Sequence, residues 1–274
     1  FYPTSGGQPH DTGTLNSVHV IDVIENENRQ IIHLLEKPIE ENLVGGCIDW
    51  KRRFDHMQQH TGQHLLSQAC IKVCDAETIS FHLGEDVSTI DVNHSGIGEH
   101  EVNAVEELAN WIIYENREVV AHFVNKEEAH KFPVRKVPTV EENIRIIEIK
   151  DFDYSPCGGT HCSHTGEIGM IKVRRWERYK GGNRIHFVCG WRALQDYQQK
   201  ATVLRHLTEM LSSGEPDLPQ NVGKLQEEAK SLRREYANLT KHLLDYEAKV
   251  LLAERETFGD FSVLIKIFEN RHPK

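Results

Sequence analysis

Two short stretches of the sequence carry residues that could bind one metal ion together. His60 and His64 are four positions apart, and a helix places residues at that spacing side by side on one face. Helices use this arrangement to offer two imidazole nitrogens to a single zinc ion. Far downstream, a glycine-rich run at 157–161 adds a thiolate from Cys157 and a third imidazole from His161. The glycines allow the backbone to bend until both side chains face one centre.

Three nitrogens and one sulfur form a donor set that suits Zn²⁺ in a reducing cytosol. We therefore predict His60, His64, Cys157 and His161 as the zinc ligands. Neither pair is specific alone, because the chain has 17 histidines and His56 also lies four positions before His60. The coincidence of a helical pair with a glycine-rich turn is what favours a metal site.

Other potential ligands lie near both pairs. Cys162 is the strongest alternative, and His164 is close to it. Cys70 and Cys74 follow the first pair, but they lie progressively farther around the helix from His64, so we interpret both as core residues.

The role of the metal stays open at this stage. The first pair lacks the glutamate of a His-Glu-x-x-His motif, so a zinc-protease mechanism has no general base there. If the four ligands are also the catalytic centre, a water, a substrate hydroxyl or another residue must supply the proton chemistry. Four protein ligands ordinarily close a zinc site and make it structural.

The surrounding elements indicate an α+β fold. Asp55 is a candidate N-cap for a helix over 56–74, and a second helix should follow Gly98. Strands are expected at 18–24, 31–35, 89–92, 119–123, 144–149, 169–173 and 185–189. This mixture suggests two helices packed on one face of a sheet. The sequence opens as if in the middle of a strand, so we expect that further residues precede it.

The composition changes after Gly190. From Val222 to Val250 the apolar residues alternate at spacings of three and four over four heptads, which is typical of a coiled coil. The segment 212–219 should break the helix, which gives a helical hairpin. A homodimer through these helices is one expectation, and a stalk without chemistry is the simpler one. The run 261–268 resembles the first strand of a further domain.

Charge and cysteine content limit the setting in which the protein acts. The net charge of −10 argues against indiscriminate nucleic-acid binding, but local basic strips remain open to a nucleic acid. No run approaches the roughly 20 apolar residues of a membrane span. Six cysteines without a secretory segment favour reduced thiols in the cytoplasm and no membrane partner. The strips are Lys51, Arg52 and Arg53, and Arg174, Arg175, Arg178, Lys180 and Arg184.

The two metal pairs and their flanking residues resemble the zinc motifs of the alanyl-tRNA synthetase editing domain and its free-standing relatives, the AlaX family. The resemblance covers residues 1–190 and includes the runs 54–66, 157–169 and 183–190. The glycine-rich run 6–13 resembles a loop of the longer AlaX types, whose N-terminal part is a small β-barrel. The resemblance to this family implies a β-barrel-like domain at 1–54, a zinc-dependent editing domain at 55–190, a helical hairpin or coiled coil at 191–257, and the start of a truncated domain at 258–274.

This resemblance implies a trans-editing aminoacyl-tRNA hydrolase, a zinc-dependent ester hydrolase that removes serine, and sometimes glycine, from mischarged tRNA(Ala). Such an activity is needed because a pocket that binds alanine rejects serine, with its added hydroxyl, only modestly and excludes the smaller glycine poorly. Thr61, Ser80 and His82 are candidates to bind the serine hydroxyl, although the last two could be ordinary strand residues. Gly6, Gly7 and Gln8 could close over the amino acid, or form a plain hairpin turn.

The two basic strips flank the expected site and could contact the CCA end of the tRNA. A solvated charged loop is the simpler interpretation of each strip. Two other functions stay open: editing of a different charged tRNA, because threonyl-tRNA synthetase carries a similar domain, and a tRNA-binding module with a structural zinc and a coiled-coil surface for a partner.

Overall fold

The computed structural model describes residues 1–134 and 144–267. The chain divides into two compact units, Phe1–Gln199 and Lys200–Lys274, and we describe each by itself. The predicted boundary between 54 and 55 lies inside the first unit and stays a prediction. Within the described ranges, no helix is both long enough and apolar enough to cross a membrane.

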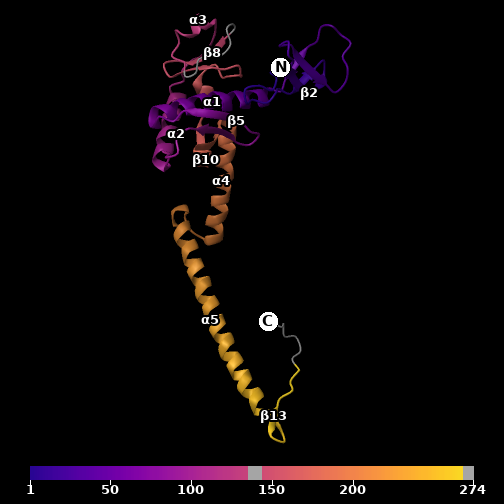
Figure 1. Ribbon diagram of the computed structural model, residues 1–274, viewed down its shortest axis with the longest axis vertical. Helices are drawn as coiled ribbons and strands as arrows, with labels where there is room; N and C mark the ends of the chain where they lie inside the picture. The colour runs from indigo at the N-terminus through magenta and orange to yellow at the C-terminus, as the bar shows by residue number, and fades with distance from the viewer. Residues whose placement is uncertain (135–143, 268–274) are drawn as a thin grey trace. The chain divides into compact units, whose positions relative to one another are not determined.

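The long helix α1 (Trp50–Cys74) is the element around which the first unit is arranged (Figure 1). Its N-cap is Asp49, whose carboxylate accepts a hydrogen bond from the backbone N–H of Arg52. Our assignment of the N-cap to Asp55 was therefore wrong. Asp55 lies inside the helix, and its carboxylate instead accepts hydrogen bonds from the guanidinium of Arg192.

A four-stranded antiparallel sheet packs against α1 and the second helix, α2 (Glu99–Tyr114). Its strand order is β10-β11-β6-β5, with β5 (Thr78–Leu83), β6 (Ser88–Val92), β10 (Ile171–Tyr179) and β11 (Gly182–Cys189).

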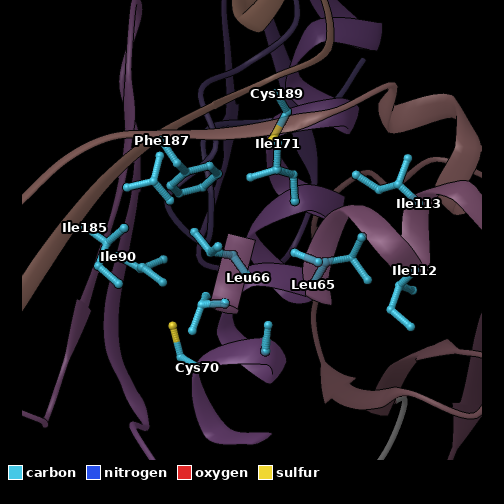
Figure 2. Packing of buried hydrophobic residues seen from close by; sticks show 14 of the residues in the cluster. Leu65, Leu66, Cys70, Ile90, Ile112, Ile113, Ile171, Ile185, Phe187 and Cys189 are labelled. Carbon is cyan, nitrogen blue, oxygen red and sulfur yellow. The ribbon is translucent and has the colours of Figure 1, made fainter. Parts of the chain in front are cut away.

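One face of this sheet forms the core with the two helices. Ile185 pairs with Ile90, and Phe187 lies two residues farther along the same strand, so all three side chains share one face. In Figure 2 these three side chains lie on one side of Leu66 of α1, and Ile112 of α2, in the same cluster, lies on the other side beyond Leu65. The predicted α+β arrangement, with helices on one sheet face, is confirmed.

A second antiparallel sheet holds the downstream metal motif. It contains β7 (Val119–Val124), β8 (Ile144–Ile149) and β9 (Asp153–Pro156), with β8 in the centre. The short helix α3 (Lys126–Ala129) packs on β8, and a 3-10 turn, η1 (Thr165–Ile168), follows the motif. Because β9 also contacts α1, the turn that leaves β9 lies beside the helical histidines.

The N-terminal strands form a third antiparallel sheet, and the order is β3-β2-β1-β4. The strands are β1 (Gly13–Leu15), β2 (Val18–Glu25), β3 (Ile31–Leu35) and β4 (Gly46–Ile48). Among the described residues β3 and β4 are its two edges and do not pair with each other. The structure thus has an open sheet here, and the closed barrel that the resemblance implied is not confirmed.

The second unit contains the end of one long helix, which begins in the first unit, and the whole of another. α4 (Gly190–Leu211) ends before the short 3-10 turn η2 (Glu215–Asp217), and α5 (Leu218–Ala253) follows, so the predicted break in the helix is confirmed. Leu218 is the one buried residue of α5, and the apolar stripe along the rest of this helix is exposed in the single chain. Packing of a helical hairpin along this stripe is therefore not observed.

A small hairpin of β12 (Glu256–Phe258) and β13 (Phe261–Val263) ends the described part of the chain. The start of the predicted terminal strand at 261 is present in β13, and Phe268 lies outside the described residues. Whether residues 258–274 begin a further domain stays a prediction.

Candidate metal centre

The four predicted ligands meet in one cluster, in which His60 and His64 are buried and Cys157 and His161 are half-buried. The ligand atoms of His60, His64, Cys157 and His161 all lie within 4.8 Å of one another. α1 supplies the first two from successive turns, and their rings stack with centroids 5.4 Å apart. The turn after β9 supplies the other two, and the ring of His161 lies 4.6 Å from that of His60. Residues almost a hundred positions apart in sequence thus converge on one point.

The unsatisfied nitrogens of this cluster are the strongest test of a metal. Both ring nitrogens of His64 and both of His161 are buried without a hydrogen bond of ordinary geometry. A buried polar group without a partner costs free energy, so each one in a native structure requires an explanation. A metal ion would take up one nitrogen of each ring. Three imidazoles and one thiolate form the tetrahedral donor set of zinc, and the residues therefore fit this ion.

The electrostatics of the cluster favour a metal-binding thiolate. Burial by itself would raise the pKa of the Cys157 thiol, but its interactions with His161, His60 and His64 outweigh burial and lower the pKa well below its usual range. The thiolate is the form that binds metals. Burial also lowers the pKa of His161 to about 3, which keeps this ring neutral and able to donate a nitrogen lone pair.

His64 differs from the other two rings because a carboxylate lies behind it. Burial would lower its pKa, but Asp153 and Cys157 raise the pKa to about 9. Nδ1 of His64 lies 3.4 Å from Oδ2 of Asp153, which is itself almost fully buried. A metal ion that binds this ring must displace the second proton, so binding releases it.

Glycine is required in the metal turn at one position and not at its neighbour. A Cβ on Gly159 would lie 2.0 Å from Cε1 of His60, whereas a Cβ on Gly158 would meet nothing within 4 Å. Arg145 of β8 also fixes the turn, because its Nη1 donates to the carbonyl oxygens of Cys157 and Gly159. Nothing in the sequence marks Arg145, because its partners are backbone atoms that only the fold brings near.

The residues predicted to bind the amino acid lie in different places. Thr61 is fully buried beside the cluster, and its hydroxyl donates to the carbonyl of Met57 and accepts from the N–H of Cys162. Ser80 and His82 are exposed on β5, and Ser80 donates to Asp91.

The β5 side chain that touches the centre is Phe81, which sequence reasoning missed. Its ring lies 5.3 Å from that of His60. Because side chains alternate along a strand, Ser80 and His82 lie on the opposite face of β5 from Phe81. The structure therefore does not bring these two residues to the cluster, and a hydrophobic residue between two polar ones is the only sequence signal for Phe81.

The glycine-rich loop reaches the centre through Gln8, which is fully buried and lies 2.9 Å from Nδ1 of His60. Gly7 has a φ of +83°, a conformation that favours glycine, and its carbonyl accepts a hydrogen bond from the N–H of Leu83. A Cβ at Gly6 would meet nothing within 4 Å.

The alternative ligands are not part of the cluster. Cys70 belongs to the hydrophobic core, and Cys74 packs against that core, as predicted. Cys162 is buried in the same core, and burial raises the pKa of its thiol to about 12. His164 and His56 are also outside the set of ligand atoms that lie within 4.8 Å of one another.

The predicted basic residues separate into three groups. Lys51, Arg52 and Arg174 line an open pocket of about 1030 Å³ beside the first turns of α1. Arg53 instead forms a buried ion pair with Asp11. Most of the other strip lies along the β10–β11 hairpin, where Arg184 pairs with Asp91 and stacks on Tyr179. The remaining members of that strip are Arg175, Arg178 and Lys180.

A smaller cavity, of about 470 Å³, reaches the metal centre itself. His161 and Cys162 form part of its wall, together with the apolar side chains of Met57 and Ile147 and the guanidinium of Arg145. A small organic group in this cavity would lie beside one of the four ligands.

The fold and the cluster define an α+β domain with a candidate metal site, and comparisons with known proteins identify its family. Residues 144–186 match the family described as the threonyl and alanyl tRNA synthetase second additional domain. The chain is 32% identical, over 97% of its length and 68% of the relative's, to the alanyl-tRNA editing protein AlaX-L of Pyrococcus horikoshii. The chain belongs to this family of AlaX-type alanyl-tRNA editing proteins.

Alanine–tRNA ligases are also similar to this chain. The enzyme of Pyrococcus furiosus is 35% identical over 98% of the chain, and that of Thermococcus kodakarensis is 35% identical over 93%. The chain covers 31% and 29% of these two proteins, so it spans about a third of the length of the ligases it matches.

Proposed function

We propose that this chain is a hydrolase that edits tRNA(Ala) charged with the wrong amino acid, with serine as its main substrate and glycine as a second one. The observation that carries the proposal is the cluster of His60, His64, Cys157 and His161 in a chain of the AlaX family. Its relatives are an alanyl-tRNA editing protein and alanine–tRNA ligases, which supports tRNA(Ala) as the nucleic acid.

The reaction is the hydrolysis of an ester. The bond between the carbonyl carbon and the ribose oxygen breaks, the oxygen of a water joins the carbonyl carbon, and a proton passes to the ribose oxygen. A zinc ion held by the four ligands would supply a Lewis acid for the carbonyl or lower the pKa of a water. The chain's own contribution is to hold the donors in a dry, fixed arrangement, with Phe81 against His60 and Arg145 on the turn.

We assign the aminoacyl group to the cavity of about 470 Å³, because His161 is in its wall. Of the three residues predicted to bind the serine hydroxyl, Thr61 is the one that lies between the two helical ligands. Thr61 is fully buried and is not among the residues that line this cavity. Its oxygen already donates one hydrogen bond and accepts another, which leaves a single lone pair for a substrate. Thr61→Val keeps the shape and removes this oxygen, so we expect it to weaken discrimination between serine and alanine.

We assign the phosphates near the CCA end to the wider pocket lined by Lys51, Arg52 and Arg174. Trp50 lines the smaller cavity and Lys51 the wider pocket, so both openings adjoin the first turn of α1. A Lys51→Ala/Arg52→Ala double variant should bind tRNA more weakly and with a shallower salt dependence, by roughly one unit of slope for each phosphate that is no longer neutralised. Lys224→Ala, on the exposed surface of α5 and outside both basic strips, is the control.

The deciding experiment measures deacylation of seryl-, glycyl- and alanyl-tRNA(Ala) by the zinc-loaded protein, with a chelated sample and a Cys157→Ala variant beside it. Release of serine or glycine but not alanine, lost on chelation and in the variant, supports editing. Binding of tRNA without release from any of the three would overturn the proposal and favour a tRNA-binding module with a structural zinc. Release only from another charged tRNA would reassign the substrate.

A further inference from the structure

The side-chain amide of Gln8 links three groups of the metal centre. Its Oε1 lies 2.9 Å from Nδ1 of His60 and accepts a hydrogen bond from the backbone N–H of Thr160 at 3.1 Å. Its Nε2 donates to the hydroxyl of Thr160 at 2.8 Å. Gln8 is fully buried, and it comes from a part of the sequence far from the residues it contacts, 52 positions before His60 and 152 before Thr160.

These contacts fix the orientation of the amide and, through it, the tautomer of His60. The backbone N–H of Thr160 can only donate, so the amide atom that faces it must be the oxygen. The same oxygen faces Nδ1 of His60, and two acceptors cannot form a hydrogen bond, so Nδ1 carries a proton. In a neutral ring Nε2 then holds the lone pair, and this atom lies 3.2 Å from Sγ of Cys157, inside the cluster.

We propose that Gln8 is a positioning residue of the metal centre, which holds His60 in the tautomer and orientation that presents Nε2 to a zinc ion and, through Thr160, fixes the turn that carries His161. This inference rests on the proposed metal site but not on the identity of the substrate. Mutation of a group that holds the second nitrogen of a ligand histidine commonly lowers metal affinity roughly 10- to 100-fold.

The N-terminal segment holds Gln8 from both sides. Ser5 and Gln8 exchange backbone hydrogen bonds of 3.1 and 2.9 Å, which close a tight turn. The carbonyl of Gly7 accepts from Leu83 on β5, and Arg53 of α1 pairs with Asp11, three residues beyond Gln8. The turn is therefore tied to the strand and to the helix, and the amide has little freedom to move.

This role differs from closure over an amino acid, which the sequence first suggested for Gln8. A primary amide can accept two hydrogen bonds and donate two. Both acceptor positions and one donor position of Gln8 are occupied within the protein, so a single N–H remains for any substrate. The contacts of Gln8 are directed to the ligands and their turn.

The test compares three variants by their affinity for zinc alone, measured by competition with a chromophoric chelator. Gln8→Leu keeps the volume of the side chain but cannot accept a hydrogen bond, and we expect its zinc affinity to fall roughly 10- to 100-fold. Gln8→Glu can accept from both Nδ1 of His60 and the Thr160 hydroxyl, so most of the affinity should return. Gln198→Leu makes the same chemical change on the exposed surface of α4 and should leave affinity unchanged.

Cobalt spectra and thermal unfolding of the metal-free protein complete the experiment. We expect the visible absorption bands of bound Co²⁺ to shift in Gln8→Leu, because His60 no longer has a fixed orientation. The metal-free variant should unfold at a temperature close to that of the metal-free wild type. Unchanged zinc affinity and spectrum in Gln8→Leu would overturn the inference, and so would equal losses in the Leu and Glu variants. Failure of the deacylation assay would leave these binding results intact, so the two proposals can fail separately.

Discussion

His64 and Asp153 face each other across the junction of α1 and β9, with Nδ1 and Oδ2 3.4 Å apart and both side chains buried. The carboxylate raises the pKa of the imidazole against the effect of burial and directs the opposite nitrogen toward Cys157. A carboxylate behind a ligand histidine increases the basicity of the ring and fixes its orientation. Asp153 therefore supports His64 as Gln8 supports His60, from a different element and with a full charge.

Asp153→Asn should weaken zinc binding, because the amide keeps the shape of the side chain and removes the charge. We expect a loss of roughly 10- to 100-fold in affinity, measured by chelator competition. Activity at limiting zinc should fall in parallel and recover with excess zinc. Asp245→Asn on the exposed surface of α5 makes the same change away from the site. Equal affinity in the two variants would contradict the role assigned to Asp153.

The two neighbouring glycines of the metal turn should respond oppositely to alanine. In Gly159→Ala the new methyl group would overlap the His60 ring, with contacts of 2.0 and 2.3 Å to Cε1 and Nδ1, so the ring must leave its place. We expect zinc affinity to fall at least about tenfold, as it does for other changes that disturb the orientation of a ligand side chain. Gly158→Ala meets open space and should behave like the wild type. Similar binding by both variants would show that the turn can shift at little cost.

Much of the centre could be predicted from the sequence, because the ligands' types and spacing are local properties. The pair on α1 follows from helical periodicity, and the turn at 157–161 from its glycines. Helices and strands also follow largely from local sequence, and β3 and β8 have the bounds that the sequence predicts.

The supporting residues were not predictable, because their partners are far away in sequence. Gln8 and Arg145 act on backbone or ring atoms that only the tertiary fold brings close, and no spacing rule marks such pairs. The N-cap was misplaced for a related reason. Asp49 and Asp55 are equally good caps by residue type, and the ion pair with Arg192 that places Asp55 inside the helix is a long-range contact.

His56 should make the folded protein sensitive to acid. Burial, followed by the charge of Arg52, lowers its pKa to about 4, whereas in the unfolded chain the pKa of a histidine is about 6.5. Between these values the unfolded state binds more protons, so the stabilising contribution is complete above about pH 6.5 and is lost as the pH falls toward 4. The difference corresponds to at most about 3 kcal/mol.

The check is urea unfolding of metal-free His56→Gln and wild type at a series of pH values. The free energy of unfolding of the wild type should fall more steeply between pH 6.5 and 4 than that of the variant, which has no ionisable group at this position. Parallel curves would show that position 56 does not cause the acid sensitivity.

The exposed stripe of α5 should drive association of two copies of the chain. Leu232, Tyr236 and Leu239 are 64, 75 and 62% exposed, and they follow the heptad spacing that two-stranded coiled coils bury. Burying one leucine contributes roughly 1.5 to 3 kcal/mol, and a dimer would bury each position twice. Leu239→Lys should therefore weaken association by about 100-fold or more, measured by sedimentation equilibrium.

Asn238→Lys is the control, because residue 238 lies beside the stripe and not in it. A dimer that persists in Leu239→Lys would place the interface elsewhere. A wild-type chain that stays monomeric at micromolar concentration would mean that something other than a second copy covers the stripe. Because the four metal ligands come from a single chain, zinc affinity should be the same in the monomeric variant and in the dimer.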